Sequence, residues 1–207
     1  MTAWAWATPL LVALALMWCH YQLDDGLGWR RDIAAKRGAG SVEGLAPRRT
    51  ILVLDLDETL VHSPNPSTDG SVGRGMLLRP HVIQFLAAVR DSFDELVVFT
   101  AGVREYASPI LDLLERSVGG TVFSRRFYRD SCSVDPRTGL LVKDLRVVSA
   151  SPEDVVLLLD NTPSAYALQP HLGVPIASFI GDPNDRALID AIPVLKRRVR
   201  RLVSSSV

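Results

Sequence analysis

The most informative segment of the chain is residues 51–60, which read Ile51-Leu52-Val53-Leu54-Asp55-Leu56-Asp57-Glu58-Thr59-Leu60. Its first residues form a short, continuous apolar run, which is typical of a parallel strand buried on both faces. Because alternate side chains of an extended segment point the same way, Asp55 and Asp57 can face one pocket. Such a pocket lies beyond the carboxyl ends of the strands in open α/β sheets. The segment therefore predicts a strand that delivers two carboxylates to a site, although acids that merely end a strand and cap the next segment are the alternative.

The rest of the chain alternates between strand and helix patterns. Glu95–Phe99 and Val155–Leu159 predict two further buried strands. Helical spacing is seen in Val82, Phe85, Leu86 and Val89, in Ile110, Leu111, Leu114 and Val118, and across Ala187–Ile192. This alternation predicts an α/β fold, with a parallel sheet covered by helices on both faces. We expect it to form one catalytic domain over residues 50–195.

Composition agrees with a single folded domain of ordinary size. The chain has 207 residues, of which 47% are hydrophobic and 22% charged, and this excludes disordered, collagen-like and coiled-coil chains. Lys and Arg number 23, as do Asp and Glu, so no global basic excess indicates a nucleic-acid-binding protein. The two cysteines, Cys19 and Cys132, exclude a disulfide framework and a multi-cysteine zinc site.

The N-terminal segment differs from this domain in composition. No charged residue precedes Asp24, and Ala3–Leu23 as a helix would span roughly 30 Å, about one hydrocarbon core. We expect residues 1–23 to be a membrane anchor; a cleaved signal peptide and a buried core helix are the alternatives. Basic residues at 30–37 follow this segment and predict that the catalytic domain faces the cytosol. Residues 24–49 are glycine-rich without a sustained apolar period, which is typical of a linker.

The last segment, residues 196–207, is predicted to be a basic C-terminal tail. It contains Lys196, Arg197, Arg198, Arg200 and Arg201. Apolar residues at positions 195, 199, 202 and 203 would form one stripe of a helix beneath this charge. Such a helix suits an anionic membrane surface, and a solvated terminal helix is the equally weighted alternative.

Several motifs resemble those of one enzyme family. Asp55-x-Asp57-x-Thr59 is similar to the first motif of the haloacid-dehalogenase superfamily, and the string 54–60 resembles its branch of phosphatases named after the RNA polymerase II carboxyl-terminal domain. Other segments follow that family's order: Arg79-Pro80-His81, Leu96–Ala101, Phe127-Tyr128-Arg129, Val142–Leu145, Leu159–Pro163, and Phe179 with Asp182-Pro183. Ordered matches over most of the chain are more specific than any single motif. With its apolar N-terminal segment, the chain resembles the Dullard-type nuclear-envelope members in particular.

The resemblance implies a catalytic role for four residues. Asp55 would attack the substrate phosphorus and form an aspartyl phosphate. Asp57 would protonate the leaving oxygen and later deprotonate the attacking water. Thr100 would donate its hydroxyl to the phosphoryl group, and Lys143 would pair with Asp55 and the phosphate.

The resemblance also implies Mg²⁺ as the cofactor. Its ligands would be the Asp55 carboxylate, the Asp57 backbone carbonyl and the Asn161 side chain, with Asp160 in support. These oxygen ligands suit a hard cation that retains several waters. Asp-Asn-x-Pro is also a common turn signature, so Asp160 and Asn161 have a structural alternative.

The other polar residues of the motifs have structural alternatives too. A Thr that ends a strand, such as Thr100, is usually structural. Lys143 beside an aspartate is ordinarily a surface pair of little energetic value. Arg129 either touches the substrate or belongs to a solvated charged face. His62 and Cys132 match family positions but have no evident chemical task.

Together these features lead us to expect a membrane-anchored, Mg²⁺-dependent protein serine/threonine phosphatase. The resemblance implies the endoplasmic reticulum or nuclear envelope membrane as its location, a lipin-type phosphatidate phosphatase as its phosphoprotein substrate, and a small membrane regulatory subunit as a partner. One alternative is a catalytically weak binding or scaffold protein that resembles the mitochondrial inner-membrane import receptor. Another is a small-molecule phosphatase of the wider superfamily. The complete catalytic set favours an enzyme over a scaffold.

One segment departs from the family. Where related phosphatases carry a longer insert, this chain has only residues 64–78 between Ser63 and Arg79. Prolines, glycines and serines are frequent in it, and we expect a loop rather than a stable hairpin.

Overall fold

The structure is a computed structural model that describes residues 48–64, 75–149 and 151–204. These residues belong to one compact unit, Arg48–Val207. The predicted membrane anchor, and all of the predicted linker except its last two residues, lie outside the described residues. Of the helices in the described ranges, none combines the length and the apolarity that crossing a membrane requires.

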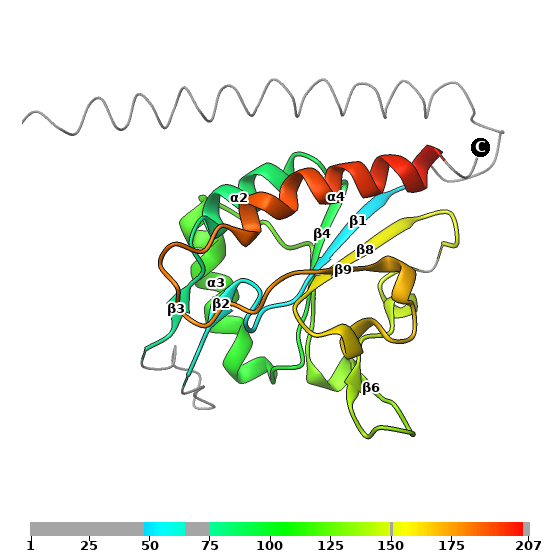
Figure 1. The fold of residues 1–207 in the computed structure, drawn as a ribbon, viewed down its shortest axis with the longest axis horizontal. Helices are drawn as coiled ribbons and strands as arrows, with labels where there is room; N and C mark the ends of the chain where they lie inside the picture. The colour runs from blue at the N-terminus through cyan, green and yellow to red at the C-terminus, as the bar shows by residue number, and fades with distance from the viewer. Residues whose placement is uncertain (1–47, 65–74, 150, 205–207) are drawn as a thin grey trace, which may run out of the picture. The chain divides into compact units, whose positions relative to one another are not determined.

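A five-stranded parallel sheet forms the centre of the domain, in the order β5-β4-β1-β8-β9 (Figure 1). The strands are β1 (Thr50–Leu54), β4 (Glu95–Phe99), β5 (Arg125–Phe127), β8 (Val155–Asp160) and β9 (Gly173–Pro175). Every residue of β1 and β8 is buried, which agrees with the apolar runs 51–54 and 155–159. After β1, the chain forms β4 and then β5 on one side of it, and later β8 and β9 on its other side. The switch point of the topology therefore lies beside β1, where α/β sheets bind ligands.

The sequence predicted three strands of this sheet and missed the two edge strands. The predicted strands coincide with β1, β4 and β8 to within one residue at either end. By contrast, β5 reads Arg-Arg-Phe and β9 reads Gly-Val-Pro, so neither contains an apolar run. Charge and proline suit edge strands, because they discourage pairing with another chain.

Long helices cover one face of the sheet. They are α2 (Val82–Arg90), α3 (Arg104–Val118) and α4 (Ala187–Ser204). In Figure 1, α2 and α4 lie side by side, and α2 also packs against α3 while α4 packs on β8. The predicted division between residues 195 and 196 falls inside α4, because the buried side chains Leu195 and Val199 continue its apolar face.

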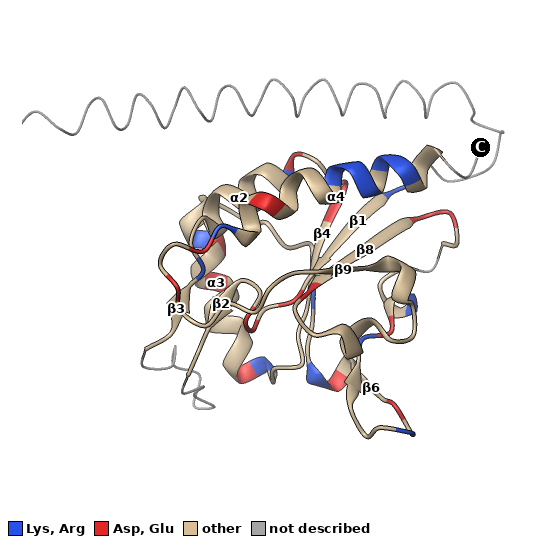
Figure 2. Ribbon diagram, viewed as in Figure 1, with Lys and Arg blue, Asp and Glu red and all other residues tan. Residues whose placement is uncertain are grey.

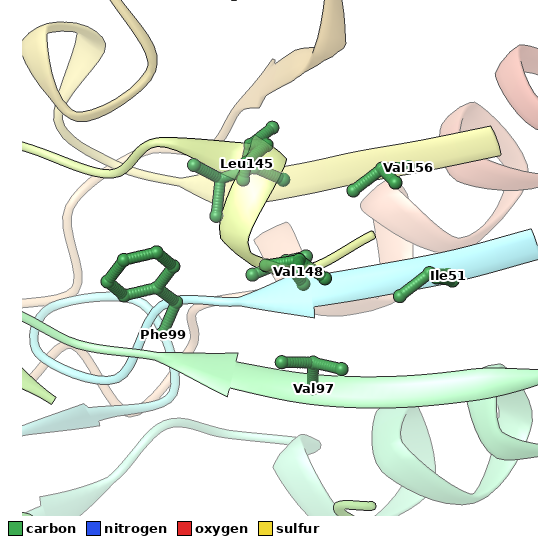
Figure 3. Packing of buried hydrophobic residues seen from close by; sticks show 8 residues of the cluster. Ile51, Val97, Phe99, Leu145, Val148 and Val156 are labelled. Carbon is green, nitrogen blue, oxygen red and sulfur yellow. The ribbon is translucent and has the colours of Figure 1, made fainter. Parts of the chain in front are cut away.

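The opposite face of the sheet has no long helix among the described residues. Figure 3 shows side chains from three strands packed against Leu145 and Val148. Leu145 is the first residue of the 3-10 helix η2 (Leu145–Val147), and Val148 follows this helix directly. Two further 3-10 helices, η3 (Pro163–Tyr166) and η4 (Pro170–Leu172), join β8 to β9 and also pack on this face. The expectation of helices on both faces is thus correct for one face only. The β8–β9 connection is short, and Pro170 would break an α-helix within it.

Two small antiparallel ladders complete the fold. β2 (Val61–His62) pairs with β3 (Leu77–Leu78), and β6 (Ser133–Val134) pairs with β7 (Leu141–Val142). The segment that we expected to be a loop therefore ends in a strand, since Leu77 and Leu78 pair with the residues just after the first motif.

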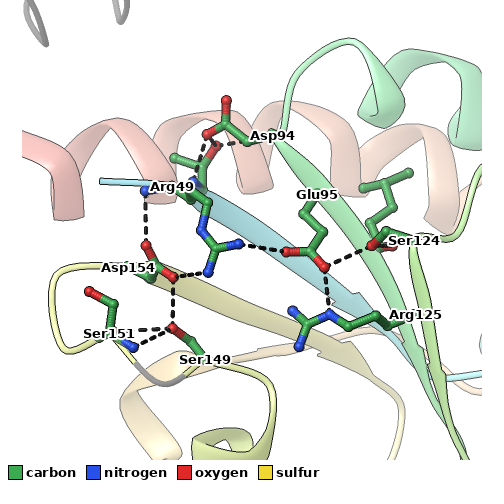
Figure 4. Close-up of polar contacts among 10 residues, drawn as sticks. Arg49, Asp94, Glu95, Ser124, Arg125, Ser149, Ser151 and Asp154 are labelled. Atoms are coloured by element: carbon green, nitrogen blue, oxygen red, sulfur yellow. Dashed lines mark hydrogen bonds and ion pairs between the residues drawn. The ribbon is translucent and has the colours of Figure 1, made fainter. Parts of the chain in front are cut away.

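Ion pairs hold the chain where it enters the domain (Figure 4). The backbone N–H and Nη2 of Arg49 donate to the Asp154 carboxylate at 3.0 and 2.7 Å. Arg49 Nη1 also lies 3.5 Å from Glu95 Oε2, and Glu95 accepts a hydrogen bond from Arg125 Nε at 2.6 Å. These contacts tie the starts of four strands together. The compact domain consequently begins at Arg48, two residues before the predicted boundary.

Candidate active site

The carboxyl ends of β1 and β8 bring two buried carboxylates together. Asp55 follows β1 directly, and its N–H donates to the Leu159 carbonyl at 3.1 Å. Asp160 is the last residue of β8, and Leu54 of β1 is paired with Leu159 in the parallel register. Asp55 is 6% exposed and Asp160 only 1%. Two neighbouring carboxylates so far from water require a positive partner.

Lys143 supplies that positive charge. Its Nζ lies 2.5 Å from Asp55 Oδ1 and 2.6 Å from Asp160 Oδ2, and its side chain is buried. Burial alone would lower the pKa of Lys143, but the two carboxylates outweigh burial and raise it, so the amine stays protonated. The alternative of a surface pair with Asp144 is wrong, because Asp144 instead binds Arg146 at 2.6 Å.

Asp57 lies between two hydroxyl groups that come from the β4–α3 connection and from α3. Thr100 Oγ1 donates to Asp57 Oδ2 at 3.3 Å, and the Tyr106 hydroxyl donates to Asp57 Oδ1. The Gly102 N–H donates to Thr100 Oγ1 at 2.9 Å and thereby helps orient this hydroxyl. Burial raises the pKa of Asp57, and the nearby Asp55 carboxylate adds to the rise, while the Tyr106 hydrogen bond opposes it. The net rise favours the protonated form, which a general acid requires.

Tyr106 is a site residue that the sequence reasoning missed. It stands four positions before Ile110 on the same helix face, so its spacing indicates an ordinary core residue. Gly102 leaves room for its ring, since a Cβ there would lie 3.0 Å from the ring and 3.1 Å from Thr100 Oγ1. Burial and the contact with Asp57 raise the pKa of Tyr106, and its hydroxyl remains a donor.

Asn161 connects the end of β8 to the first motif. Its Oδ1 accepts a hydrogen bond from Thr59 Oγ1 at 3.3 Å, and its Nδ2 donates to Ser178 Oγ at 2.9 Å. Asp160 Oδ1 accepts from the Thr162 N–H at 2.8 Å, as the predicted turn requires. The segment is thus a turn and at the same time places polar side chains beside the first motif.

The donor atoms and the charge of this site fit Mg²⁺. The predicted ligands, Asp55, the Asp57 carbonyl and Asn161, present only oxygen atoms. The site has three carboxylates, of which Asp55 and Asp160 contact the one ammonium group, so negative charge is in excess when all are ionised. Burial and the Asp55 charge raise the pKa of Asp160 to about 6, which reflects this excess. Across the described ranges, no three His, Cys, Asp or Glu side chains form a metal-binding group, so carbonyl, amide and water ligands would have to complete the shell.

A buried arginine, which the sequence placed in a family motif without a role, supports the backbone after Asp57. Arg79 is 1% exposed and binds both carboxylate oxygens of Asp185 at 2.8 Å. It also donates to the carbonyls of Glu58, Thr59 and Ala177 at 3.3, 3.1 and 2.7 Å. Glu58 has a φ of 55°, a left-handed conformation that costs energy for a residue other than glycine. Arg79 therefore holds a strained turn in place.

The remaining polar residues of the motifs lie beside the site or in the core. Arg129 is exposed, and its Nε donates to the Ala101 carbonyl at 2.6 Å. The His62 ring meets Phe179 edge-on, at 6.4 Å between centroids. Cys132 is half-buried against the core cluster of Figure 3. These positions are compatible with the structural alternatives for His62 and Cys132.

Known proteins are similar in sequence to the described domain. The sequence pattern of the NLI interacting factor-like phosphatases matches residues 50–206. CTD nuclear envelope phosphatase 1 of Xenopus laevis is 39% identical over 168 residues, which cover 72% of this chain and 66% of that protein. Nuclear envelope morphology protein 1 of Saccharomyces cerevisiae is 35% identical over 172 residues, which cover 70% of this chain and 38% of that protein. A probable C-terminal domain small phosphatase of Dictyostelium discoideum is 39% identical over 156 residues, which cover 70% of this chain and 49% of that protein. The chain therefore spans about two thirds of the Xenopus protein and less of the other two.

Solved structures share the fold. Fcp1, an essential RNA polymerase II CTD phosphatase, superposes with a TM-score of 0.50 at 20% identity, over 75% of this chain and 49% of that chain. An uncharacterized protein from Listeria monocytogenes serotype 4b gives a TM-score of 0.51 at 15% identity, over 73% of this chain and 99% of that chain. The α/β fold with a parallel central sheet, which the alternation of strand and helix patterns predicted, is thereby confirmed. With a family pattern that covers most of its length and relatives that are more than a third identical, this chain belongs to the NLI interacting factor-like phosphatase family.

Proposed function

We propose that this protein is a Mg²⁺-dependent protein serine/threonine phosphatase that works through an aspartyl phosphate. The observation that carries the proposal is the pairing of Asp55 with Lys143, next to Asp57 with its raised pKa, at the carboxyl edge of the central strand. Membership of a phosphatase family supports phosphoryl chemistry. The names of the CTD phosphatase relatives support a phosphoprotein as the substrate.

In the first half of the reaction, a carboxylate oxygen of Asp55 attacks the phosphorus of the substrate. The bond between phosphorus and the serine or threonine oxygen breaks as the new bond to Asp55 forms. Asp57 gives its proton to the departing oxygen, so the product leaves as a neutral alcohol. Lys143 and the Thr100 hydroxyl stabilise the negative charge on the phosphoryl oxygens.

In the second half, water attacks the phosphorus of the aspartyl phosphate. Asp57, now ionised, accepts a proton from this water, and the bond between phosphorus and Asp55 breaks. Inorganic phosphate leaves, Asp55 is again a carboxylate, and Asp57 is again protonated. A bound Mg²⁺, held by Asp55, the Asp57 carbonyl and Asn161, would offset the charge of the carboxylates and of the phosphate dianion.

The cellular setting is part of the proposal. Relatives named for the nuclear envelope support a location at that membrane or at the endoplasmic reticulum, with anchoring through residues 1–23. A lipin-type phosphatidate phosphatase as the substrate, and a small membrane subunit as a partner, follow from the family resemblance. The catalytic domain would face the cytosol or the nucleus.

Turnover by the fragment Arg48–Val207 tests the chemistry. We expect it to hydrolyse phosphoserine peptides, and to lose all activity in Asp55→Asn while the fold is retained, since this change removes the nucleophile at nearly constant volume. The control Asp112→Asn makes the same change at a half-exposed carboxylate on α3 and should keep full activity. EDTA should stop turnover and Mg²⁺ should restore it.

Several results would contradict the proposal. Residual turnover in folded Asp55→Asn would exclude the covalent mechanism, and indifference to EDTA would exclude the metal. A wild-type fragment that binds phosphopeptides without hydrolysing them would favour the scaffold alternative. A fragment that hydrolyses only small phosphate esters would favour a small-molecule phosphatase.

A further inference from the structure

The C-terminal half of α4 carries a basic surface that the proposed reaction does not use. Figure 2 shows Lys and Arg gathered on this half of the helix. Its sequence, Lys196-Arg197-Arg198-Val199-Arg200-Arg201, contains no acidic residue. Leu195 and Val199 are fully buried in the domain, and residues 202 and 203 are partly buried, so the apolar stripe that we expected beneath a membrane-bound helix packs on the domain instead. The helix cannot insert this stripe into a bilayer, but its charged side remains in solvent.

The side chains of two arginines on this side have no partner within the described residues. Arg197 and Arg200 are exposed, and neither guanidinium group forms a hydrogen bond or ion pair with a residue in the part of the chain that the structure describes. Arg201 is also exposed. Val194, one turn before Arg197 on the same side, is 38% exposed. The face formed by Val194, Arg197, Arg200 and Arg201, here called the α4 basic face, therefore combines positive charge with an apolar side chain.

The chain enters the domain at the C-terminal end of α4. Arg48, the first described residue, donates from Nη1 to the Val203 carbonyl at 3.4 Å. The segment that precedes Arg48 is therefore joined to the domain at a residue that contacts the end of α4. It includes the uncharged segment 3–23, the proposed anchor. A bilayer that held this segment would present its headgroups to the α4 basic face at a high effective concentration.

We propose that the α4 basic face docks the domain on anionic lipid headgroups. An exposed apolar residue among exposed arginines suits the interface of a bilayer, and each basic residue near an anionic surface strengthens binding by roughly fivefold. An acidic segment of a protein is the competing occupant. The position of Arg48 favours the membrane, because the apolar segment precedes it in the chain.

Docking by this face leaves the catalytic edge open. Arg48 precedes β1 and Asp55 follows it, so the two residues lie at opposite ends of a strand that rises roughly 17 Å over its five residues. The basic end of α4 is at the Arg48 end. The basic end of α4 would thus meet the membrane near the start of β1, while the Asp55 site lies at the other end of this strand, where soluble substrates can reach it.

Vesicle binding by the fragment Arg48–Val207 tests the docking without the anchor. Every buried core residue of the described chain lies within this fragment, so it keeps its core. We expect it to bind vesicles of phosphatidylcholine with phosphatidylserine, not phosphatidylcholine alone, and to dissociate at high salt. The triple variant Arg197→Ala/Arg200→Ala/Arg201→Ala should bind weaker by on the order of a hundredfold.

A matched variant controls for net charge. Arg90→Ala/Arg116→Ala/Arg137→Ala removes the same charge from exposed positions on α2, α3 and the β6–β7 hairpin, and it should bind within a few-fold of the wild type. Both triple variants should hydrolyse a soluble aryl phosphate at the wild-type rate. Equal rates would also show that both are folded and that docking is separate from catalysis.

A single tryptophan reports the orientation. The four tryptophans of the chain all precede Arg48, so the fragment has none. Brominated phosphatidylcholine in anionic vesicles should quench Val194→Trp on α4 but not Val134→Trp, which is exposed on β6.

Four outcomes would overturn the proposal. The first is equal binding to neutral and anionic vesicles, and the second is equal loss of binding in the two triple variants. The third is quenching at Val134→Trp instead of Val194→Trp. Binding to polyglutamate without binding to anionic vesicles would assign the α4 basic face to an acidic protein and would equally refute a lipid occupant.

Discussion

Replacing Arg79 by methionine should strongly destabilise the domain. Arg79 is buried and makes five hydrogen bonds, two to Asp185 and three to backbone carbonyls. Methionine fills part of the same volume but leaves the Asp185 carboxylate without its cation and the carbonyls without their donor. Because breaking a buried ion pair costs about 3–5 kcal/mol, we expect the free energy of unfolding to fall by about 4 kcal/mol. That is a large share of the roughly 5–15 kcal/mol that stabilises a typical domain.

Urea unfolding of the fragment Arg48–Val207, followed by far-UV circular dichroism, measures this loss. With a slope of about 2 kcal/mol per molar urea, the midpoint should fall by roughly 2 M. Arg90→Met, at an exposed position on α2, is the matched control and should change stability by less than about 0.5 kcal/mol. In the double variant with Asp185→Asn, the loss from Arg79→Met should shrink, because the unpaired charge is gone. A loss below about 1 kcal/mol for Arg79→Met would refute the reasoning that this side chain holds the turn.

Three further predictions concern the site, the response to acid and the anchor. Tyr106→Phe should lower kcat more for a phosphoserine peptide than for an aryl phosphate, because a poor leaving group depends more on the proton that Asp57 delivers; equal losses would assign Tyr106 a purely structural role. Arg79 holds the pKa of Asp185 below its usual range, so the stability from this pair is complete above the unfolded pKa of about 4 and is lost as the pH falls through the lower folded value. Urea midpoints measured from neutral to acidic pH should therefore fall more steeply in the wild type than in Asp185→Asn, and parallel curves would contradict this linkage. The chain of residues 1–207 should stay with membranes in carbonate extraction while the fragment from Arg48 is released, and release of the chain 1–207 would contradict the anchor.

The sequence alone determined the centre of the sheet and the position of the acidic residues. Apolar runs at β1, β4 and β8 are local signals, because a strand buried on both faces must be apolar at every position. Parallel strands also end at one edge, so the order of the runs was enough to bring Asp55 and Asp160 together. The family followed from motifs in a fixed order, and the comparisons confirmed it.

The tertiary structure decided which contacts the buried polar groups make. Lys143 is 88 residues from Asp55, and only the family resemblance pointed to their pairing, because Lys143 next to Asp144 has the local sequence of a surface charge. Tyr106 is 49 residues from Asp57, and its spacing along the helix is that of an ordinary core residue. Arg79 and Asp185 are 106 residues apart and meet only when α4 packs beside α2. Sequence periodicity indicates which face of a helix or strand is buried. The contacts of a buried polar group depend instead on segments that are distant in the sequence and meet only in the folded chain.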